Sequence, residues 1–389
     1  MTAQLHTTLD SPLLPTYARA GVTFVRGEGC RLWDDAGRSY LDFAAGIAVV
    51  GLGHGHPAPL AAAHEQLDRL WHASNLYFTE PMARLASLLA QRVAERVGGV
   101  QAFFCNSGAE ANEAAFKYAR KATGRTRVVA LEGGFHGRTL GALSVTGQPA
   151  KWEGFGPLVP GVSFAPPNDV EALEAAIAPS ADVALVLLEP ILGEGGVVPL
   201  ETKFVAAAAE IAAESGALLC VDEVQTGVGR TGTFLASEQL DLRPDLVTLA
   251  KGLGNGLPIG ALLVSDRVAG GFVPGDHGST FGGNPVSCAA ACAVVDAIDD
   301  DLLSNVRARG AELAAGLAAM PGVTGVRGKG LLLGATLDRP AAPVVDSCRD
   351  RGLLVLSAGP DVLRLTPPLV LGPAEVEEAL AVLGDVLAA

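Results

Sequence analysis

The sequence contains few cysteines, six in 389 residues, and no apolar run long enough to cross a bilayer. Its N-terminal stretch lacks the apolar core and the basic start of a signal peptide. Only Cys288 and Cys292 lie one helical turn apart, and no second pair completes a zinc spacing. We therefore predict a cytoplasmic protein that binds no metal and whose cysteines are small buried residues.

Positive charge is also scarce in this chain. Lysine and arginine number 28 against 42 aspartates and glutamates, so the formal net charge is −14. A surplus of negative charge repels phosphodiester backbones and anionic lipid head groups. The sequence has no Walker-type lysine motif, and it shows no internal repeats or long linkers. These absences argue against nucleic acids, membrane surfaces and nucleoside triphosphates as partners, and they favour a small-molecule ligand.

From about residue 60 to residue 270 the chain alternates short apolar runs with helical patterns. Helical periodicity is clear in Ala109–Ala122 and in Lys203–Ser215, which ends at the C-cap candidate Gly216. Continuously apolar strands between helices indicate an α/β fold with a largely parallel sheet that is covered on both faces. The predicted strands are Arg127–Leu131, Val162–Ala165, Val183–Leu188, Leu218–Asp222, Leu246–Ala250 and Ala261–Ser265.

After Asn284-Pro285 the pattern changes to alanine-rich helices, short strands and two further helices, which is typical of an α+β unit. The first 60 residues carry strand and turn signals but too little apolar sequence for a core of their own. We expect them to pack on the C-terminal unit. The predicted domains are an N-terminal segment of a small domain (1–60), a large domain (61–284) and the C-terminal small domain (285–389).

A helix start with unusually small residues follows the apolar segment 102–105. Ser107 and Glu110 have the spacing of a capping box, which by itself indicates no more than a helix N-terminus. Gly108 and Ala109 would also let a ligand approach the exposed amides at the positive end of the helix. The segment is therefore a candidate phosphate site.

Polar residues stand at the ends of two apolar runs. Asp222 ends the first run, and carboxylates at the C-terminal ends of parallel strands usually face a ligand crevice, although such a residue can also cap a turn. Lys251 follows the second run, where burial would lower its pKa and make it a better nucleophile. A solvated lysine just past the strand is the alternative. Pyridoxal phosphate needs an anion site, a carboxylate for its pyridine nitrogen and an amine, and these three segments can supply them together.

The segment Gly227–Gly232 formally matches the dinucleotide fingerprint GxGxxG and makes an NAD-dependent dehydrogenase an alternative. The context is unfavourable, because the polar residues 222–226 separate the glycines from the apolar run. No helix pattern opens after them, and no acidic residue follows at the expected spacing.

The chain resembles the class III aminotransferases over nearly its whole length. The resemblance rests on a combination of specific segments. These are Asn106-Ser107-Gly108-Ala109-Glu110-Ala111-Asn112-Glu113, Phe135-His136-Gly137-Arg138-Thr139, Glu189-Pro190, Gly193-Glu194-Gly195-Gly196, Asp222-Glu223-Val224-Gln225-Thr226-Gly227, Lys251-Gly252, Gly278-Ser279-Thr280-Phe281-Gly282-Gly283-Asn284-Pro285 and Leu363-Arg364-Leu365-Thr366-Pro367-Pro368.

The resemblance implies a type I pyridoxal-phosphate fold, with a mostly parallel seven-stranded sheet in the large domain and a small α+β domain. It implies that Lys251 is the catalytic lysine that forms the Schiff base and shuttles the proton, and that Asp222 pairs with the pyridine nitrogen. Thr280 would reach the phosphate of the neighbouring subunit, which implies a homodimer with shared active sites. The other implied cofactor-binding residues are Ser107, Gly108 and Ala109 at the phosphate, Phe135 stacked on the ring, Gln225 near the ring hydroxyl, and Glu223 and Val224 beside them.

The resemblance also implies how substrates bind. Arg138 would hold a substrate carboxylate, while Glu194 would mask Arg364 for one substrate and release it for the other. Ser279 and Tyr17 complete the implied substrate site. The implied reaction transfers the δ-amino group of N2-acetylornithine to 2-oxoglutarate, a step of arginine biosynthesis. Related amino donors remain open, namely succinyl-diaminopimelate, ornithine, 4-aminobutyrate and a carrier-linked lysine.

Overall fold

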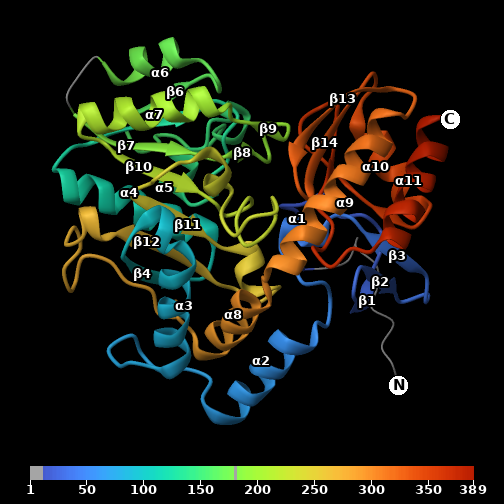
Figure 1. Cartoon of the computed structure of the whole chain (residues 1–389), viewed down its shortest axis with the longest axis horizontal. Helices are drawn as coiled ribbons and strands as arrows, with labels where there is room; N and C mark the ends of the chain where they lie inside the picture. Colours follow the sequence, from blue (N-terminus) through green and yellow to red (C-terminus); the bar gives the residue numbers. More distant parts are fainter. Residues whose placement is uncertain (1–11, 179–181) are drawn as a thin grey trace.

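A seven-stranded sheet forms the centre of the larger part of the molecule (Figure 1). In spatial order its strands are β4 (Val100–Cys105), β12 (Gly260–Ser265), β11 (Leu246–Leu249), β10 (Leu218–Asp222), β7 (Val183–Leu188), β5 (Arg127–Leu131) and β6 (Val162–Ala165). β12 runs antiparallel to both neighbours, and the other neighbouring strands are parallel. The prediction of a mostly parallel α/β sheet is confirmed. The computed structural model describes residues 12–178 and 182–389.

Helices cover both faces of this sheet because its central strands are apolar on both sides. In β7, Leu185 and Leu187 belong to the core shared with one helix, whereas Val186 and Leu188 belong to the core on the opposite face. The helix on the first face is α4 (Gly108–Thr123). The helices on the second face are α6 (Val170–Ile177) and α7 (Thr202–Ser215). A further helix, α3 (Glu80–Val97), packs against β4.

The residues that flank α4 explain where this helix begins and ends. The Ser107 hydroxyl oxygen accepts a hydrogen bond from the Glu110 amide (3.2 Å), as the capping box predicts. The helix ends at Gly124 in the left-handed conformation (φ 69°), and α7 ends in the same way at Gly216 (φ 70°). Only two residues separate β4 from α4, so the N-terminus of the helix lies at the edge where the parallel strands end.

The two ends of the chain meet in a second unit. The N-terminal strands β1 (Phe24–Glu28), β2 (Arg31–Asp34) and β3 (Ser39–Asp42) form a sheet in which β15 (Leu353–Leu354) pairs with β3. A second sheet has the order β13 (Val323–Lys329), β14 (Leu332–Leu337), β17 (Val362–Leu365) and β16 (Leu356–Ser357). The helices of this unit are α9 (Asp300–Ala318), α10 (Ala341–Asp350) and α11 (Pro373–Leu387).

The two units meet at α8 (Pro285–Ala297), which begins at the predicted boundary. α8 packs against α2 (Pro57–Arg69) and α3, whereas α9 packs on β13 and β14. The remaining elements are α1 (Ala45–Ala48), α5 (Leu140–Ser144), η1 (Pro149–Lys151), β8 (Ile191–Leu192), β9 (Val198–Pro199), η2 (Ala236–Leu240), η3 (Lys251–Gly254) and η4 (Asp266–Val268).

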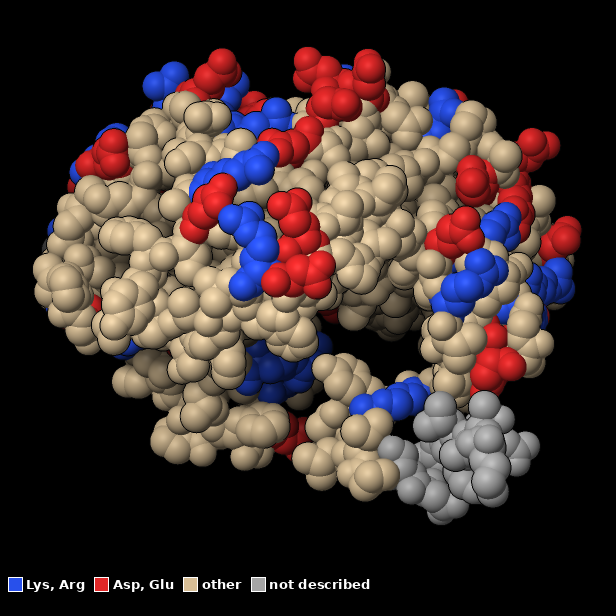
Figure 2. Space-filling view, turned by 90° about the horizontal axis from the view of Figure 1, so that it is seen from below, with Lys and Arg blue, Asp and Glu red and all other residues tan. Residues whose placement is uncertain are grey.

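Charged side chains of both signs are mixed over the face shown in Figure 2, and this face is hollowed near its middle, with basic atoms in the depth of the hollow. Among the helices of residues 12–178 and 182–389, none combines the length and the apolar character that crossing a membrane requires.

Candidate active site

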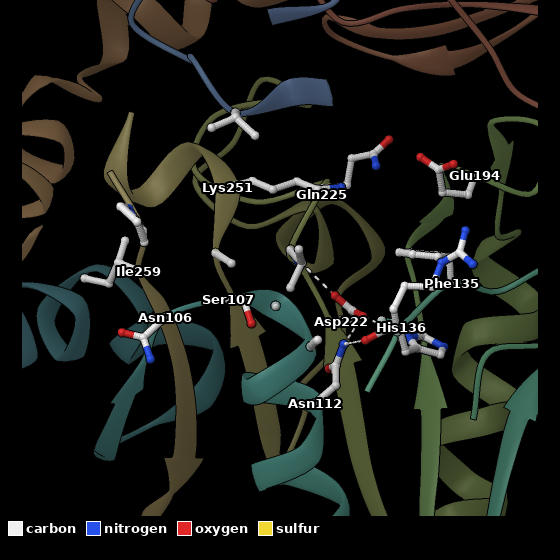
Figure 3. A pocket seen from close by; sticks show the side chains of 18 of the residues that line it. Asn106, Ser107, Asn112, Phe135, His136, Glu194, Asp222, Gln225, Lys251 and Ile259 are labelled. Carbon is white, nitrogen blue, oxygen red and sulfur yellow. Dashed lines mark hydrogen bonds and ion pairs between the residues drawn. The ribbon is translucent and has the colours of Figure 1, made fainter. Parts of the chain in front are cut away.

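A cavity of about 410 Å³ lies at the carboxyl ends of the parallel strands, beside the N-terminus of α4 (Figure 3). Such an edge is where ligands bind in open α/β sheets. Several separate segments of the large unit line it, together with Val49 from the N-terminal segment. The lining residues are Val49, Asn106, Ser107, Gly108, Ala109, Asn112, Phe135, His136, Gly137, Arg138, Glu189, Glu194, Asp222, Val224, Gln225, Ala250, Lys251, Gly256, Leu257, Pro258 and Ile259.

The start of α4 forms an amide-lined part of the wall. Ser107, Gly108 and Ala109 all line the cavity, so the free N–H groups and the positive end of the helix dipole face it. A Cβ atom at Gly108 would lie 2.7 Å from a methyl group of Val224, so the close approach of these two segments requires glycine. This geometry suits a phosphate group.

Asp222 ends β10 with its carboxylate buried in the cavity floor. Its Oδ2 accepts a hydrogen bond from Asn112 Nδ2 (2.7 Å) and lies 2.7 Å from His136 Nδ1, and its Oδ1 accepts from the Val224 amide (3.0 Å). The Thr248 hydroxyl donates to Asn112 Oδ1 (2.9 Å), which fixes the orientation of the amide. The carboxylate is therefore held in one orientation by three partners.

His136 supports the negative charge of Asp222. Burial disfavours the imidazolium, but the hydrogen bond and the charge of Asp222 outweigh burial and raise the pKa of His136 above its usual value. The other two partners of Asp222, Asn112 and the Val224 amide, are also hydrogen-bond donors. Asp222 can thus offer its carboxylate to a cationic group in the cavity.

Lys251 follows β11 after one intervening residue, Ala250, and lines the cavity from a strained backbone position. Its φ is +44°, in the left-handed region that non-glycine residues seldom adopt. Burial lowers the pKa of the Lys251 ammonium, and the carboxylate of Glu194 only partly offsets this. A larger fraction of neutral amine results, as a nucleophile requires.

A buried ion pair stands next to the cavity. Arg364 Nη1 donates to Glu194 Oε1 (2.5 Å), to the Gly193 carbonyl (3.1 Å) and to Gln225 Oε1 (3.3 Å). The Arg364 side chain is 3% exposed and the Glu194 side chain 26% exposed, so the carboxylate is the member that has room to move. Burial raises the pKa of Glu194, but the charge of Arg364 outweighs burial and lowers it overall. We call this pair the gate.

Phe135 and Arg138 lie on the loop that follows β5. Both line the cavity, and the Arg138 guanidinium is 5.7 Å from the centroid of the Phe135 ring. The ammonium of Lys151, at the end of η1, is 5.8 Å from the same centroid. Arg138 is exposed, so its fork is free to meet a carboxylate that enters from solvent.

The structure leaves five of the predicted site residues outside the cavity wall, and one of them, Arg364, bonds to the lining residues Glu194 and Gln225. Tyr17 is 73% exposed and Thr280 is also exposed. Ser279 lies behind the cavity wall. Its hydroxyl oxygen accepts a hydrogen bond from Nδ2 of the lining residue Asn106 (3.2 Å). The roles of Tyr17, Ser279 and Thr280 stay predictions.

Glu223 is the fifth of these residues, and its side chain faces away from the cavity. The buried carboxylate accepts hydrogen bonds from the Ala236 amide (3.0 Å) and the Ser237 amide (2.8 Å) and is bonded to the Thr226 hydroxyl (2.5 Å). These bonds hold the first residues of η2 next to the segment that follows β10. The Glu223 side chain therefore bonds to neighbouring parts of the fold, whereas the next residue, Val224, lines the cavity.

Several cavity residues had no predicted role, and three of them, Asn112, His136 and Glu189, bond to other parts of the site. All three lie within segments that carry the family resemblance, and that position was the available signal. Their contacts join residues 54 to 110 positions apart in the chain, so spacing along the sequence does not reveal them. No cluster of histidine, cysteine, aspartate or glutamate suited to a metal ion occurs in the described part of the chain.

Comparison with known proteins agrees with this geometry. The profile of the family described as "Aminotransferase class-III" matches residues 16–387. The chain is 49% identical to the acetylornithine aminotransferase of Gloeobacter violaceus, with 97% of this chain and 96% of the relative covered. It is 51% identical to that of Streptomyces coelicolor, with 96% and 93% covered.

Solved structures show the same architecture. The N-acetylornithine aminotransferase of Stenotrophomonas maltophilia has a TM-score of 0.83 and 39% identity, with 96% of this chain and 97% of that chain covered. The ornithine aminotransferase of Toxoplasma gondii has a TM-score of 0.91 and 32% identity, with 97% and 92% covered.

Proposed function

Because the chain belongs to the class-III aminotransferases, we propose that it transfers the δ-amino group of N2-acetylornithine to 2-oxoglutarate. The products would be N-acetylglutamate 5-semialdehyde and glutamate, a step of arginine biosynthesis. Acetylornithine aminotransferases that are 43–51% identical over nearly the full length support this donor. Family membership removes the dehydrogenase alternative.

The cavity fits pyridoxal phosphate, the cofactor of this class. Bound there, the cofactor would supply an electron-withdrawing ring that stabilises a substrate carbanion. The α4 amides beside Gly108 would hold its phosphate, and Phe135 would contact its ring. The anionic Asp222 would hold a proton on the ring nitrogen, and Lys251 would form the covalent link and carry a proton to and from the substrate carbon.

The gate is the observation that best supports transamination over racemisation or decarboxylation. A transaminase admits an amine and a keto diacid to one site in turn, so it needs a positive charge that can be covered and uncovered. Arg364 is such a charge, because it is buried and its carboxylate partner Glu194 is partly exposed. The second carboxylate of 2-oxoglutarate could take the place of Glu194 on Arg364.

The charges around Phe135 favour an acylated donor over free ornithine. Arg138 and Lys151 both stand within 6 Å of its ring centroid. The α-ammonium of ornithine would meet this positive charge, whereas the acetylated nitrogen of N2-acetylornithine is neutral. The α-carboxylate of either compound suits the Arg138 fork. Succinyl-diaminopimelate, 4-aminobutyrate and a carrier-linked lysine remain alternatives.

A half-reaction screen tests the donor assignment. Each candidate amine is mixed with the cofactor-loaded enzyme, and the loss of visible absorbance is followed by stopped flow. N2-acetylornithine should react with the highest kcat/KM. A higher kcat/KM for any other amine on the panel would contradict the assignment.

Replacing Arg138 should weaken donor binding. In Arg138→Met the donor carboxylate loses a bidentate, charge-assisted contact, so KM for N2-acetylornithine should rise about 10- to 100-fold with little change in kcat. Arg138→Lys should recover part of this, because it keeps the charge without the fork. Steady-state kinetics check the result, with the exposed Arg339→Met as control. An unchanged KM with a reduced kcat would be inconsistent with this role.

Removing the gate carboxylate should affect the two substrates in opposite directions. Glu194→Ala leaves the buried Arg364 without its carboxylate partner, so KM for 2-oxoglutarate should fall. The kcat/KM for the amine should drop about tenfold, because the unneutralised cation repels the amine. Separate half-reactions measure both values. The exposed Glu153→Ala is the matched control. Equal loss in the two half-reactions would show that Glu194 does not discriminate between the substrates.

We further propose a cytoplasmic homodimer in which Thr280 reaches the cofactor of the neighbouring subunit. Large apolar side chains stand exposed on the segment before α3 and beside Thr280, which is the kind of surface that subunit contacts bury. They include Trp71 (68% exposed), Leu76 (86%), Phe78 (95%) and Phe281 (62%).

A further inference from the structure

Glu189 is a buried carboxylate in the cavity wall to which the reaction described above gives no role. It follows the last residue of β7 and is 6% exposed. Its Oε1 accepts a hydrogen bond from the Phe135 amide at 2.7 Å, and its Oε2 accepts from the Gly193 amide at 3.4 Å. One side chain therefore bonds two loops that are far apart in the chain.

Each of these loops carries a working part of the site. Phe135 presents its ring to the cavity. The Gly193 carbonyl accepts from Arg364, and the next residue, Glu194, pairs with the same guanidinium. Gly193 also packs closely on the ring-side residue Gln225, because a Cβ atom at 193 would lie 2.2 Å from Gln225 Oε1. The carboxylate thus lies between the ring contact and the gate.

Charged groups from three other segments face Glu189. They are His136 from the loop after β5, Asp222 from β10 and Lys251 from η3. Burial raises the pKa of Glu189 to about 7, although the charge of His136 opposes this. Above that pH the carboxylate accepts from both amides, and below it one oxygen carries a proton and the weaker bond to Gly193 is lost first.

We propose that Glu189 is a positioning residue that ties the Phe135 loop to the Gly193–Glu194 turn, so that the ring contact and the gate shift together between the two half-reactions. The inference rests on the proposed function only in requiring a two-substrate reaction, and it holds for any amino donor. If Glu189 merely capped one loop, loosening it would leave the other loop unchanged.

The direct test is hydrogen–deuterium exchange on cofactor-loaded Glu189→Gln. Glutamine keeps the size, but its amide group turns a donor toward one of the two backbone N–H groups. Exchange should accelerate about tenfold in peptides that cover 133–138 and in those that cover 191–196. Glu238→Gln is the matched control, because Glu238 accepts from the Leu235 amide (2.8 Å) away from the cavity. Acceleration in only one of the two peptides would overturn the proposal.

Kinetics supply a second readout. In Glu189→Gln, kcat/KM for 2-oxoglutarate should fall about tenfold more than that for the amine, because the keto diacid needs the gate to open and re-form. In the wild type the ratio of the two constants should rise with pH through about 7, and it should be flat in the variant. An equal loss in both half-reactions, or an unchanged pH profile, would count against coupling.

Glu189→Asp is a second variant that keeps the proposal testable if Glu189→Gln does not fold. Aspartate keeps the charge but is one methylene shorter, so it can reach the Phe135 amide or the Gly193 amide but not both. Acceleration in both peptides, smaller than in Glu189→Gln, and an intermediate kinetic ratio are expected, and wild-type behaviour in both readouts would refute the proposal. The exchange measurement uses no donor, so a wrong donor assignment leaves its outcome unaffected.

Discussion

Lys251→Ala is expected to abolish transamination and the visible absorbance of the cofactor-loaded enzyme together. The variant lacks the amine that forms the covalent link and the base that moves the proton, and proton transfer alone contributes about 10²- to 10⁴-fold. Turnover with N2-acetylornithine and the absorption spectrum are measured on the same sample. Lys251 is the one lysine among the described residues that line the cavity, so no other lysine is placed to replace it.

Two further variants make the Lys251 experiment specific. Lys251→Arg keeps a positive charge that cannot be neutralised near neutral pH, so it should be as inactive as alanine. Lys203→Ala removes an exposed lysine paired with Glu201 and should behave as wild type. Retained turnover in Lys251→Ala would refute the assignment of this residue.

Asp222→Asn should lower kcat about 10²- to 10³-fold while the protein still folds, because a neutral amide cannot stabilise a cation in a buried site. Single-turnover rates of both half-reactions measure the loss, which should appear in each. Asp245→Asn is the matched control, since Asp245 accepts from the Leu219 amide (3.0 Å) at the other end of the same strand. A kcat within a few-fold of wild type would remove Asp222 from the chemistry.

The same variant should change how stability depends on pH. The folded protein holds the pKa of His136 above its unfolded value through Asp222, so this pair stabilises the fold fully below the unfolded pKa. That contribution is lost as pH rises through the raised pKa. In Asp222→Asn this pH-dependent part of the melting temperature should disappear, and thermal melts of the apoenzyme from pH 5 to 9 would show it. A variant profile that is parallel to the wild type would argue that His136 is neutral.

The strands of the large sheet could be predicted because their burial leaves a local signal. β5, β6, β7 and β10 begin and end where the predicted strands do. Both faces of these strands pack against apolar side chains, so most of their residues are apolar. β12 was predicted as a strand too, but its antiparallel direction was not, because direction depends on the route of the chain between strands.

Some residues of the site could be predicted from the sequence, whereas the direction of their neighbours' side chains could not. Ser107, Asp222 and Lys251 could be proposed because each ends or follows a recognisable element, and the common edge of the sheet then brings them around one cavity. Alternation along the chain after β10 turns Val224 toward the cavity and Glu223 away from it, which the motif alone does not distinguish.

The sequence by itself determined the fold class, the family and the chemical groups at the strand ends, because apolar periodicity and short motifs are local properties of the chain. Only the tertiary structure decided which groups support them. His136 beside Asp222, Glu189 between two loops and Glu194 on Arg364 are contacts between residues 54 to 170 positions apart. Their pKa values depend on burial and on these neighbours, and both arise only when the chain is folded.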